Sequence, residues 1–250
     1  MNGLVRFFVI LMLFLSGQNG FSAELQRVEV EALLKKADKN HIADLRRKDL
    51  TGLDLSGLDF RHADLWGADL RGTNLSESNL SGLVLDLTVM VAANFEGADL
   101  SNVSIFGVSM MRANLSYANL SGSRVIAIMD NANLSHANLS NINWGADMKN
   151  QSMGLMRASL KKANLSGANI SNANLNRAMM RFANLKGANL QNTELFSANL
   201  EGADLTDADL TGADFSYAKL NDADFTNAKV EGTVFKKIKN KETVKGIDFK

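Results

Sequence analysis

The 250-residue chain contains no cysteine and no proline. Without cysteine it has no disulfide, no thiolate metal site and no cysteine nucleophile. Its only histidines are His41, His62 and His136, and their spacing gives little basis for a zinc site. A chain of this length normally has about a dozen prolines. Their absence indicates that few positions tolerate the loss of a backbone N–H donor.

The charge of the chain is balanced, with 27 basic and 27 acidic side chains. A nucleic-acid binder is usually strongly basic, and a mimic of nucleic acid is strongly acidic. The overall charge therefore argues against both classes. The distribution is uneven, however: seven basic and no acidic residues lie between Met148 and Thr193, whereas nine acidic and two basic residues lie between Glu194 and Glu231.

Residues 1–23 have the layout of a secretory signal peptide. Arg6 precedes an unbroken apolar run from Phe7 to Leu15, and small residues follow toward Ala23. The run is shorter than the roughly 20 apolar residues that span a bilayer. The sequence therefore predicts export to a periplasmic or secreted location, with cleavage after Ser22 or Ala23. An uncleaved anchor is the weaker alternative.

Residues 24–43 are predicted to form a short helix and the entry to the region that follows. Leu25, Val28 and Ala32 recur at helical spacing. Acidic residues lie early in this segment and lysines lie late, as the helix dipole favours. We expect this helix to cover the open end of a repeat structure.

From residue 44 the sequence repeats every five residues. Apolar residues occupy every fifth position from Leu45 to Val125 and from Leu155 to Phe235, and the spacing continues between these runs in a shifted frame. A period of five fits neither a helix nor a simple strand, but it fits three extended residues followed by a two-residue turn. A chain that turns so often buries no core within one turn, so successive coils must stack at about 4.8 Å.

The repeating unit is typified by Ala163-Asn164-Leu165-Ser166-Gly167. In this unit Ala and Leu are expected to point inward and Asn outward, while Ser and Gly form the corner. The unit resembles the pentapeptide-repeat family over about 190 of the 250 residues. The resemblance implies an all-β fold, a right-handed parallel quadrilateral β-helix with four repeats in each coil. It implies little about function, because one fold supports many functions.

These patterns divide the chain into four parts. Residues 1–23 are the signal peptide, 24–43 the capping helix and entry, 44–235 the β-helix, and 236–250 a basic C-terminal tail or cap. An irregular stretch is expected at 125–155, where the five-residue spacing slips twice. The tail is expected either to cover the last coil or to extend into solvent.

Catalysis is not expected. Most carboxylates occupy the outward position of a repeat, which is weak evidence for an acid/base pair. No Gly-x-Ser-x-Gly nucleophile motif and no phosphate-binding glycine loop occurs in the sequence. The sequence therefore predicts a non-enzymatic protein with no cofactor, no metal and no small-molecule substrate.

Two surface patches are candidate interaction sites. Extra apolar residues stand where corners normally face water, and contiguous exposed apolar surface usually marks an interface. A distorted coil that buries these side chains is the alternative. Cations from successive coils form the second patch, which either binds an anionic surface or is simply solvated. The apolar candidates are Trp66, Phe106 and Ile126 on one face and Val91 and Met111 on another; the basic candidates are Arg157, Lys161, Arg177 and Arg181.

The favoured function is an exported, non-enzymatic scaffold that binds a protein partner through its flat sides, with a homodimer as one option. A binder of polyanions or of the cell envelope, using the basic patch, is the first alternative. The second is a DNA-mimicking topoisomerase inhibitor, as some members of the resembled family are. The export signal argues against it, as do the 16 basic residues beside 21 acidic ones from 44 to 235. Nucleic acid is not expected as a partner, and membrane association is expected only through an uncleaved signal segment or the basic tail.

Cell fractionation followed by mass measurement of the intact protein tests the export prediction. We expect a product that lacks residues 1–22 or 1–23 and is found outside the cytoplasm, because cleavage removes the apolar run. A full-length product in the cytoplasm would contradict this prediction and would favour the topoisomerase hypothesis.

Overall fold

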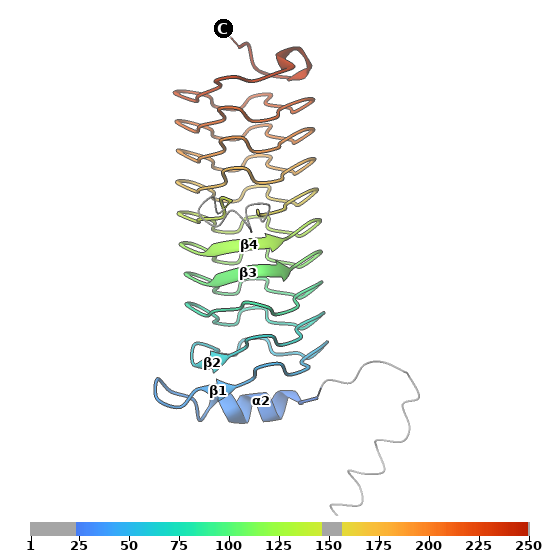
Figure 1. Ribbon diagram of the computed structural model, residues 1–250, viewed down its shortest axis with the longest axis vertical. Coiled ribbons are helices and arrows are strands. Elements are labelled where there is room, and N and C mark those ends of the chain that lie inside the picture. Colours follow the sequence, from blue (N-terminus) through green and yellow to red (C-terminus); the bar gives the residue numbers. More distant parts are fainter. Residues whose placement is uncertain (1–23, 147–156, 250) are drawn as a thin grey trace, which may run out of the picture.

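The structure is a stack of short coils that together build one straight rod (Figure 1). It is a computed structural model that describes residues 24–146 and 157–249, so the expected signal peptide lies outside the described residues. β1 pairs with β2 and β3 pairs with β4, both in parallel. The elements are α2 (Arg27–Leu34), β1 (Ala43–Asp44), β2 (Ala63–Asp64), β3 (Ser104–Ser109), β4 (Arg124–Ile128) and a short 3-10 helix, η3 (Lys241–Thr243).

Each coil has four sides, because parallel bridges join residues 20 apart along most of the rod. In one coil Asn174, Met179, Asn184 and Asn189 are the outward residues of four successive sides. We name these the first, second, third and fourth sides in that order. Consecutive sides are joined by a two-residue corner whose second residue has a positive φ, as at Arg177 (64°) between the first and second sides.

The repeat 163–167 uses every backbone N–H group that it contains. Leu165 and Gly167 donate to carbonyls of the next coil at 2.7 and 2.9 Å, and Asn164 donates to the preceding coil at 2.9 Å. Ala163 donates to a carbonyl of its own coil at 3.1 Å, and Ser166 donates to the Asn164 side chain at 3.2 Å. Proline lacks this donor, so any position of such a repeat would lose a hydrogen bond to it. This arrangement accounts for the absence of proline from the coils.

The inward positions form one continuous apolar core. Leu165 and Ala163 are both fully buried, as expected, and the equivalent leucines and alanines of other coils are buried in the same way. Burying one leucine completely contributes about 1.5–3 kcal/mol. The core therefore stabilises the rod along its whole length. The largest fully buried side chains are Trp144, Phe60, Phe95, Phe215 and Phe225.

Asparagine side chains form hydrogen-bonded ladders along the third and fourth sides. Each amide Nδ2 donates to the Oδ1 atom of the preceding coil, as from Asn133 to Asn114 at 3.1 Å. The third-side ladder starts at Asp54, whose carboxylate accepts from Asn74 at 2.9 Å. All amides point the same way, so a carboxylate, which only accepts, suits the N-terminal end. The third-side ladder is Asp54, Asn74, Asn94, Asn114, Asn133, Asn164 and Asn184; the fourth-side ladder is Asp99, Asn119, Asn138, Asn169 and Asn189.

The first break in the five-residue spacing lies at the corner between the first and second sides. Phe106 of β3 pairs with Ile126 of β4, but Val108 pairs with Ala127, so Gly107 has no counterpart in the next coil. β4 therefore passes straight through a position where other coils turn. This is the bulge that a one-residue register shift produces.

The second break lies one coil later at the same corner. Asn143 pairs with Asn174, a separation of 31 rather than 20, so eleven extra residues enter after Trp144. Residues 129–144 between the two breaks keep the regular pattern. The irregular stretch expected over 125–155 is therefore too broad, because each break is confined to one corner. Leu155, expected as an inward residue, lies outside the described residues.

The helix α2 lies beneath the first coil (Figure 1). Glu29 accepts a hydrogen bond from the Gln26 backbone N–H at 2.8 Å, which closes the start of the helix as a capping box does. Val30 is fully buried and belongs to the same apolar cluster as the inward residues of the coils. Arg27 donates to two carbonyls of the first coil at 2.9 and 3.0 Å. Apolar and polar contacts therefore join α2 to the rod.

Residues after Phe235 return over the last coil. Lys245 pairs with Asp224 on the third side, and the Phe225 N–H donates to the Lys245 carbonyl at 2.9 Å. The ring of Phe249 packs edge-on against Phe235, with centroids 5.3 Å apart. The C-terminal segment thus contacts both the backbone and the apolar end of the rod.

Exchanging asparagine and aspartate in the third-side ladder tests its direction. Asn133→Asp removes the donor to Asn114 and brings oxygen atoms together, so we expect the free energy of unfolding to fall by about 1–3 kcal/mol. The reverse exchange, Asp204→Asn, extends the ladder with an amide that donates to Asn184, so we expect no loss. Urea denaturation measures both, and equal losses in the two variants would contradict a directional ladder.

Candidate functional site

The second side differs from the third and fourth sides along the middle of the rod. In five successive coils the third and fourth sides carry asparagine or aspartate at the outward position. The second side carries neither, so no amide ladder forms there and the surface is largely apolar. Its outward residues in these coils are Val89, Ser109, Ile128, Ser159 and Met179.

Apolar side chains on and beside the second side are exposed to solvent. Val89, Met111 and Ile128 are 37%, 36% and 47% exposed. Val91 lies half-buried at the corner with the third side, one coil before Met111. Leu87, at the corner with the first side, is exposed. A contiguous exposed apolar surface of this kind usually serves an interaction.

The other predicted apolar candidates lie at the corner between the first and second sides. Trp66 and Phe106 are half-buried. Ile126 is only 2% exposed, so its expected place on an exposed surface is wrong. The physical reason is the missing residue between Ile126 and Ala127: the coil does not turn there, and Ile126 lies buried beside the resulting hollow, outside the apolar core cluster.

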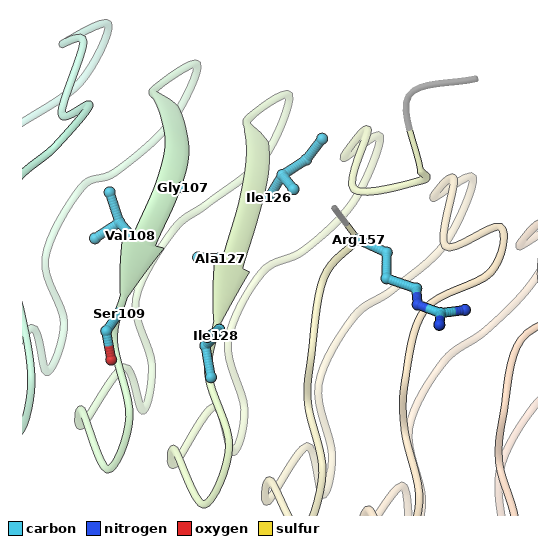
Figure 2. Close-up of a pocket in the computed structure, with 7 residues that line it drawn as sticks. All are labelled: Gly107, Val108, Ser109, Ile126, Ala127, Ile128 and Arg157. Carbon is cyan, nitrogen blue, oxygen red and sulfur yellow. The ribbon is translucent and has the colours of Figure 1, made fainter. Parts of the chain in front are cut away.

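A hollow of about 290 Å³ lies where the corner residue is missing. Figure 2 shows β3 and β4 side by side, with Ile126 and Ile128 on β4 and Arg157 on the next coil. The walls are mostly aliphatic, and the guanidinium of Arg157 points away from β4. Such a hollow suits an apolar group that has an anionic neighbour. Its lining residues are Gly107, Val108, Ser109, Ile126, Ala127, Ile128 and Arg157.

The four predicted basic residues also border the second side. Ser159 pairs with Met179, so Arg157 lies one coil before Arg177 at the corner with the first side. By the same register, Lys161 lies one coil before Arg181 at the corner with the third side. The basic candidates therefore flank Ser159 and Met179, the C-terminal part of the same column.

Two of these four cations already have carboxylate partners. Lys161 Nζ lies 3.7 Å from Asp130 Oδ2, and Arg181 Nη2 lies 2.7 Å from Glu201 Oε1. Within the part of the chain that the structure describes, Arg157 and Arg177 form no ion pair. The charge available to an anionic ligand is therefore concentrated at the corner with the first side.

The N-terminal end of the second side is acidic but locally neutralised. Arg71 Nη2 lies 2.5 Å from Asp69 Oδ2. This hydrogen bond, opposed by partial burial, holds the pKa of Asp69 below its ordinary value. On the first side, hydrogen bonds from Arg46 lower the pKa of Asp44 to about 2. Exposed pairs of this kind contribute little to stability, because water and salt screen them.

Aromatic side chains outside the core gather at the two corners that border the second side. Six such side chains occur in the described coils, and five of them lie at these corners. Phe182 illustrates the arrangement: it is 51% exposed and lies over Gly202, where any side chain would meet its ring. Aromatic residues are enriched at protein interfaces. The five are Trp66, Phe106, Phe182, Phe196 and Tyr217, and the sixth is Tyr117.

The described residues contain neither a cluster of metal-ligating side chains nor a helix that could span a membrane. Within residues 24–146 and 157–249 no three His, Asp or Glu side chains lie together as a metal would require. His136 instead stacks on Tyr117, with ring centroids 5.1 Å apart. None of the helices described by the structure has the length and apolar character needed to cross a bilayer.

The structure unites surfaces that the sequence analysis had separated. Trp66 and Phe106 were expected on a different face from Val91 and Met111, but the two stacks flank one side at its opposite corners. The sequence does contain a sign that these residues border one side, namely a column of outward residues without asparagine or aspartate. It was hidden because the one-residue slip after Ile126 interrupts the 20-residue offset.

Comparison with known proteins identifies the family. Eight copies of the repeat described as Pentapeptide repeats match residues 43–67, 68–105, 93–125, 155–192 and 193–232. The chain belongs to the pentapeptide-repeat family. Pentapeptide-repeat proteins are right-handed quadrilateral β-helices and are generally structural or interaction proteins without enzymatic activity. The expected fold is thereby confirmed for the coils.

Solved structures of pentapeptide-repeat proteins are similar to this chain. HetL, involved in heterocyst differentiation regulation in the cyanobacterium Nostoc sp. strain PCC 7120, is 29% identical, with a TM-score of 0.53, over 77% of this chain and 87% of HetL. Full-length QnrB1, a plasmid-mediated fluoroquinolone resistance protein, is 18% identical, with a TM-score of 0.41, over 78% of this chain and 92% of QnrB1. No curated protein matches the chain. The likeness to HetL supports the β-helical fold.

A matched pair of isoleucine variants tests the assignment of the bulged corner. Ile126→Asp places a carboxylate at a buried position, so we expect the free energy of unfolding to fall by about 3 kcal/mol or more. Ile128→Asp, two residues later, changes an exposed side chain, so we expect a change within about 0.5 kcal/mol. Urea denaturation at neutral pH measures both variants, and equal effects would contradict the placement of this corner.

Proposed function

We propose that this pentapeptide-repeat protein is an exported, non-enzymatic scaffold whose second side binds a protein partner. One observation carries the proposal. In five successive coils the third and fourth sides have asparagine or aspartate at the outward position, whereas the second side has neither. Exposed Val89, Met111 and Ile128 take the place of that polar surface. A protein interface typically has an apolar and aromatic centre with a polar rim, and this side has that composition.

The charge beside the apolar surface indicates the chemistry of the partner. Arg157 and Arg177 border the apolar part and have no carboxylate partner among the described residues. A partner that presents an apolar side chain to the hollow and acidic side chains beside it would complement both features. Complementary charge of this kind favours fast and specific association.

The alternative functions account for fewer of these features. A polyanion binder would need the basic patch, but Lys161 and Arg181 are already paired with Asp130 and Glu201. A DNA mimic would need an acidic surface, whereas the middle of the second side is apolar and its C-terminal part is basic. A protein partner uses the apolar surface and the unpaired cations together.

Two further elements complete the proposal. Export of the chain is supported by the apolar run of residues 7–15 behind Arg6. A capping role for α2 is supported by the burial of Val30 against the core of the first coils. Covering an open end in this way protects a repeat rod from end-to-end association.

Replacing Phe106 and Met111 by serine tests whether the second side binds a partner. We expect Phe106→Ser/Met111→Ser to lose most self-association or partner capture, because both side chains border the second side. The stability of this variant should fall by no more than about 2 kcal/mol, since neither side chain is in the core. The measurements are sedimentation velocity and capture of partners from the same compartment, with wild type and variant at equal concentration.

The control is Tyr117→Ser, which removes an exposed aromatic ring from the corner between the third and fourth sides. We expect this variant to assemble and to capture partners as wild type does. Unchanged assembly and capture by the Phe106→Ser/Met111→Ser variant would overturn the proposal. Equal loss in the control would show that apolar exposure in general, and not the second side, is responsible.

A further inference from the structure

The C-terminal end of the second side holds another hollow, of about 560 Å³. It is separate from the apolar surface around Val89, Met111 and Ile128 that we propose as the binding site for a protein. Lys219, Lys237 and Lys239 line it, and all three side chains are exposed. Lys219 is an outward residue of the second side, and Lys239 follows it by 20 residues in the C-terminal segment. Lys237 follows the inward Phe235 by two residues, at the corner with the first side. Three ammonium groups therefore surround one space.

No carboxylate neutralises these lysines in the part of the chain that the structure describes. None of the three forms an ion pair with another described residue. The carboxylate at the edge of the hollow, Glu201, is already held by Arg181 at 2.7 Å. Like charges around one space repel each other unless a counter-charge occupies it. The arrangement favours an anion with more than one charge.

Neutral hydrogen-bond donors line the same hollow. The ring of Tyr217 packs against Phe196, with centroids 5.2 Å apart, and this contact holds the phenol in place. The side chains of Asn221 and Asn240 also line the space, and neither has a hydrogen-bond partner among the described residues. Phenol and amide hydrogens donate to anionic oxygens, and lysine is a common phosphate-binding residue.

We propose that this hollow binds a ligand that carries a phosphate or pyrophosphate group. A pyrophosphate group has several negative charges and many acceptor oxygens, so it matches three ammonium groups and the neutral donors at once. A single carboxylate would leave at least one lysine without a counter-charge. The same group occurs in soluble phosphate esters and in phospholipid headgroups, and the chemistry of the hollow is the same for both.

Calorimetric titration of the complete protein with inorganic pyrophosphate at low salt tests the proposal. We expect one site per chain in wild type. The variant Lys219→Gln/Lys237→Gln/Lys239→Gln should raise the dissociation constant by about tenfold or more, since it removes three charge-assisted contacts. The matched control is Lys35→Gln/Lys36→Gln/Lys39→Gln, which removes three exposed lysines near α2 and the same net charge, and should bind as wild type does.

Two further measurements complete the test. Tyr217→Phe should weaken pyrophosphate binding several-fold without changing the unfolding midpoint, because it removes only a hydroxyl. Flotation with phosphatidylcholine vesicles that contain phosphatidic acid distinguishes a lipid headgroup from a soluble phosphate ester as the ligand. Co-flotation that pyrophosphate abolishes indicates a lipid headgroup, and the absence of co-flotation indicates a soluble ester. Wild type that binds no pyrophosphate would overturn the proposal, and so would equal affinity in the triple variant and the control.

Discussion

Backbone hydrogen bonds between coils are the constraint on which the rest of this structure depends. In the repeat 163–167 every N–H group has an acceptor, and three of the five acceptors belong to a neighbouring coil. An unsatisfied backbone donor inside such a stack would cost about as much as a lost hydrogen bond. The chain contains no proline, and most coils keep 20 residues, the spacing that brings each donor of a regular coil to its acceptor.

This register turns each outward position into a column. On the third and fourth sides the columns are amide ladders, in which every Nδ2 group donates toward the N-terminal end and a carboxylate begins the ladder. On the second side the column is Val89, Ser109, Ile128, Ser159 and Met179, which forms no ladder. The first arrangement stabilises the rod itself. The second has no such role, which is one reason why we propose the second side as the binding surface.

The two breaks in the repeat lie at the same corner of the rod. The residue missing beside Gly107 and the eleven extra residues after Trp144 fall at one corner, in successive coils. That corner borders the second side, and the apolar hollow and most of the outward aromatic rings lie there too. Arg157 and Arg177, which form no ion pair with another described residue, lie at the same corner. At this corner the missing residue leaves an apolar hollow that is lined by β3, β4 and Arg157.

The sequence by itself determined the inward and outward residues and the columns of an unbroken stretch. Leu165 is buried as predicted, and Arg181 forms an ion pair with Glu201, the residue that an offset of 20 places beside it. These features follow from local spacing, because three extended residues and a turn leave little freedom. Only the tertiary structure decided which corner absorbs the missing residue, and hence that Ile126 is buried while Ile128 is exposed. It also decided that two predicted patches border one side. The reason is that hydrogen bonds between whole coils determine the corner at which residues are missing or inserted. The five-residue pattern cannot indicate that corner, because it is the same on all four sides.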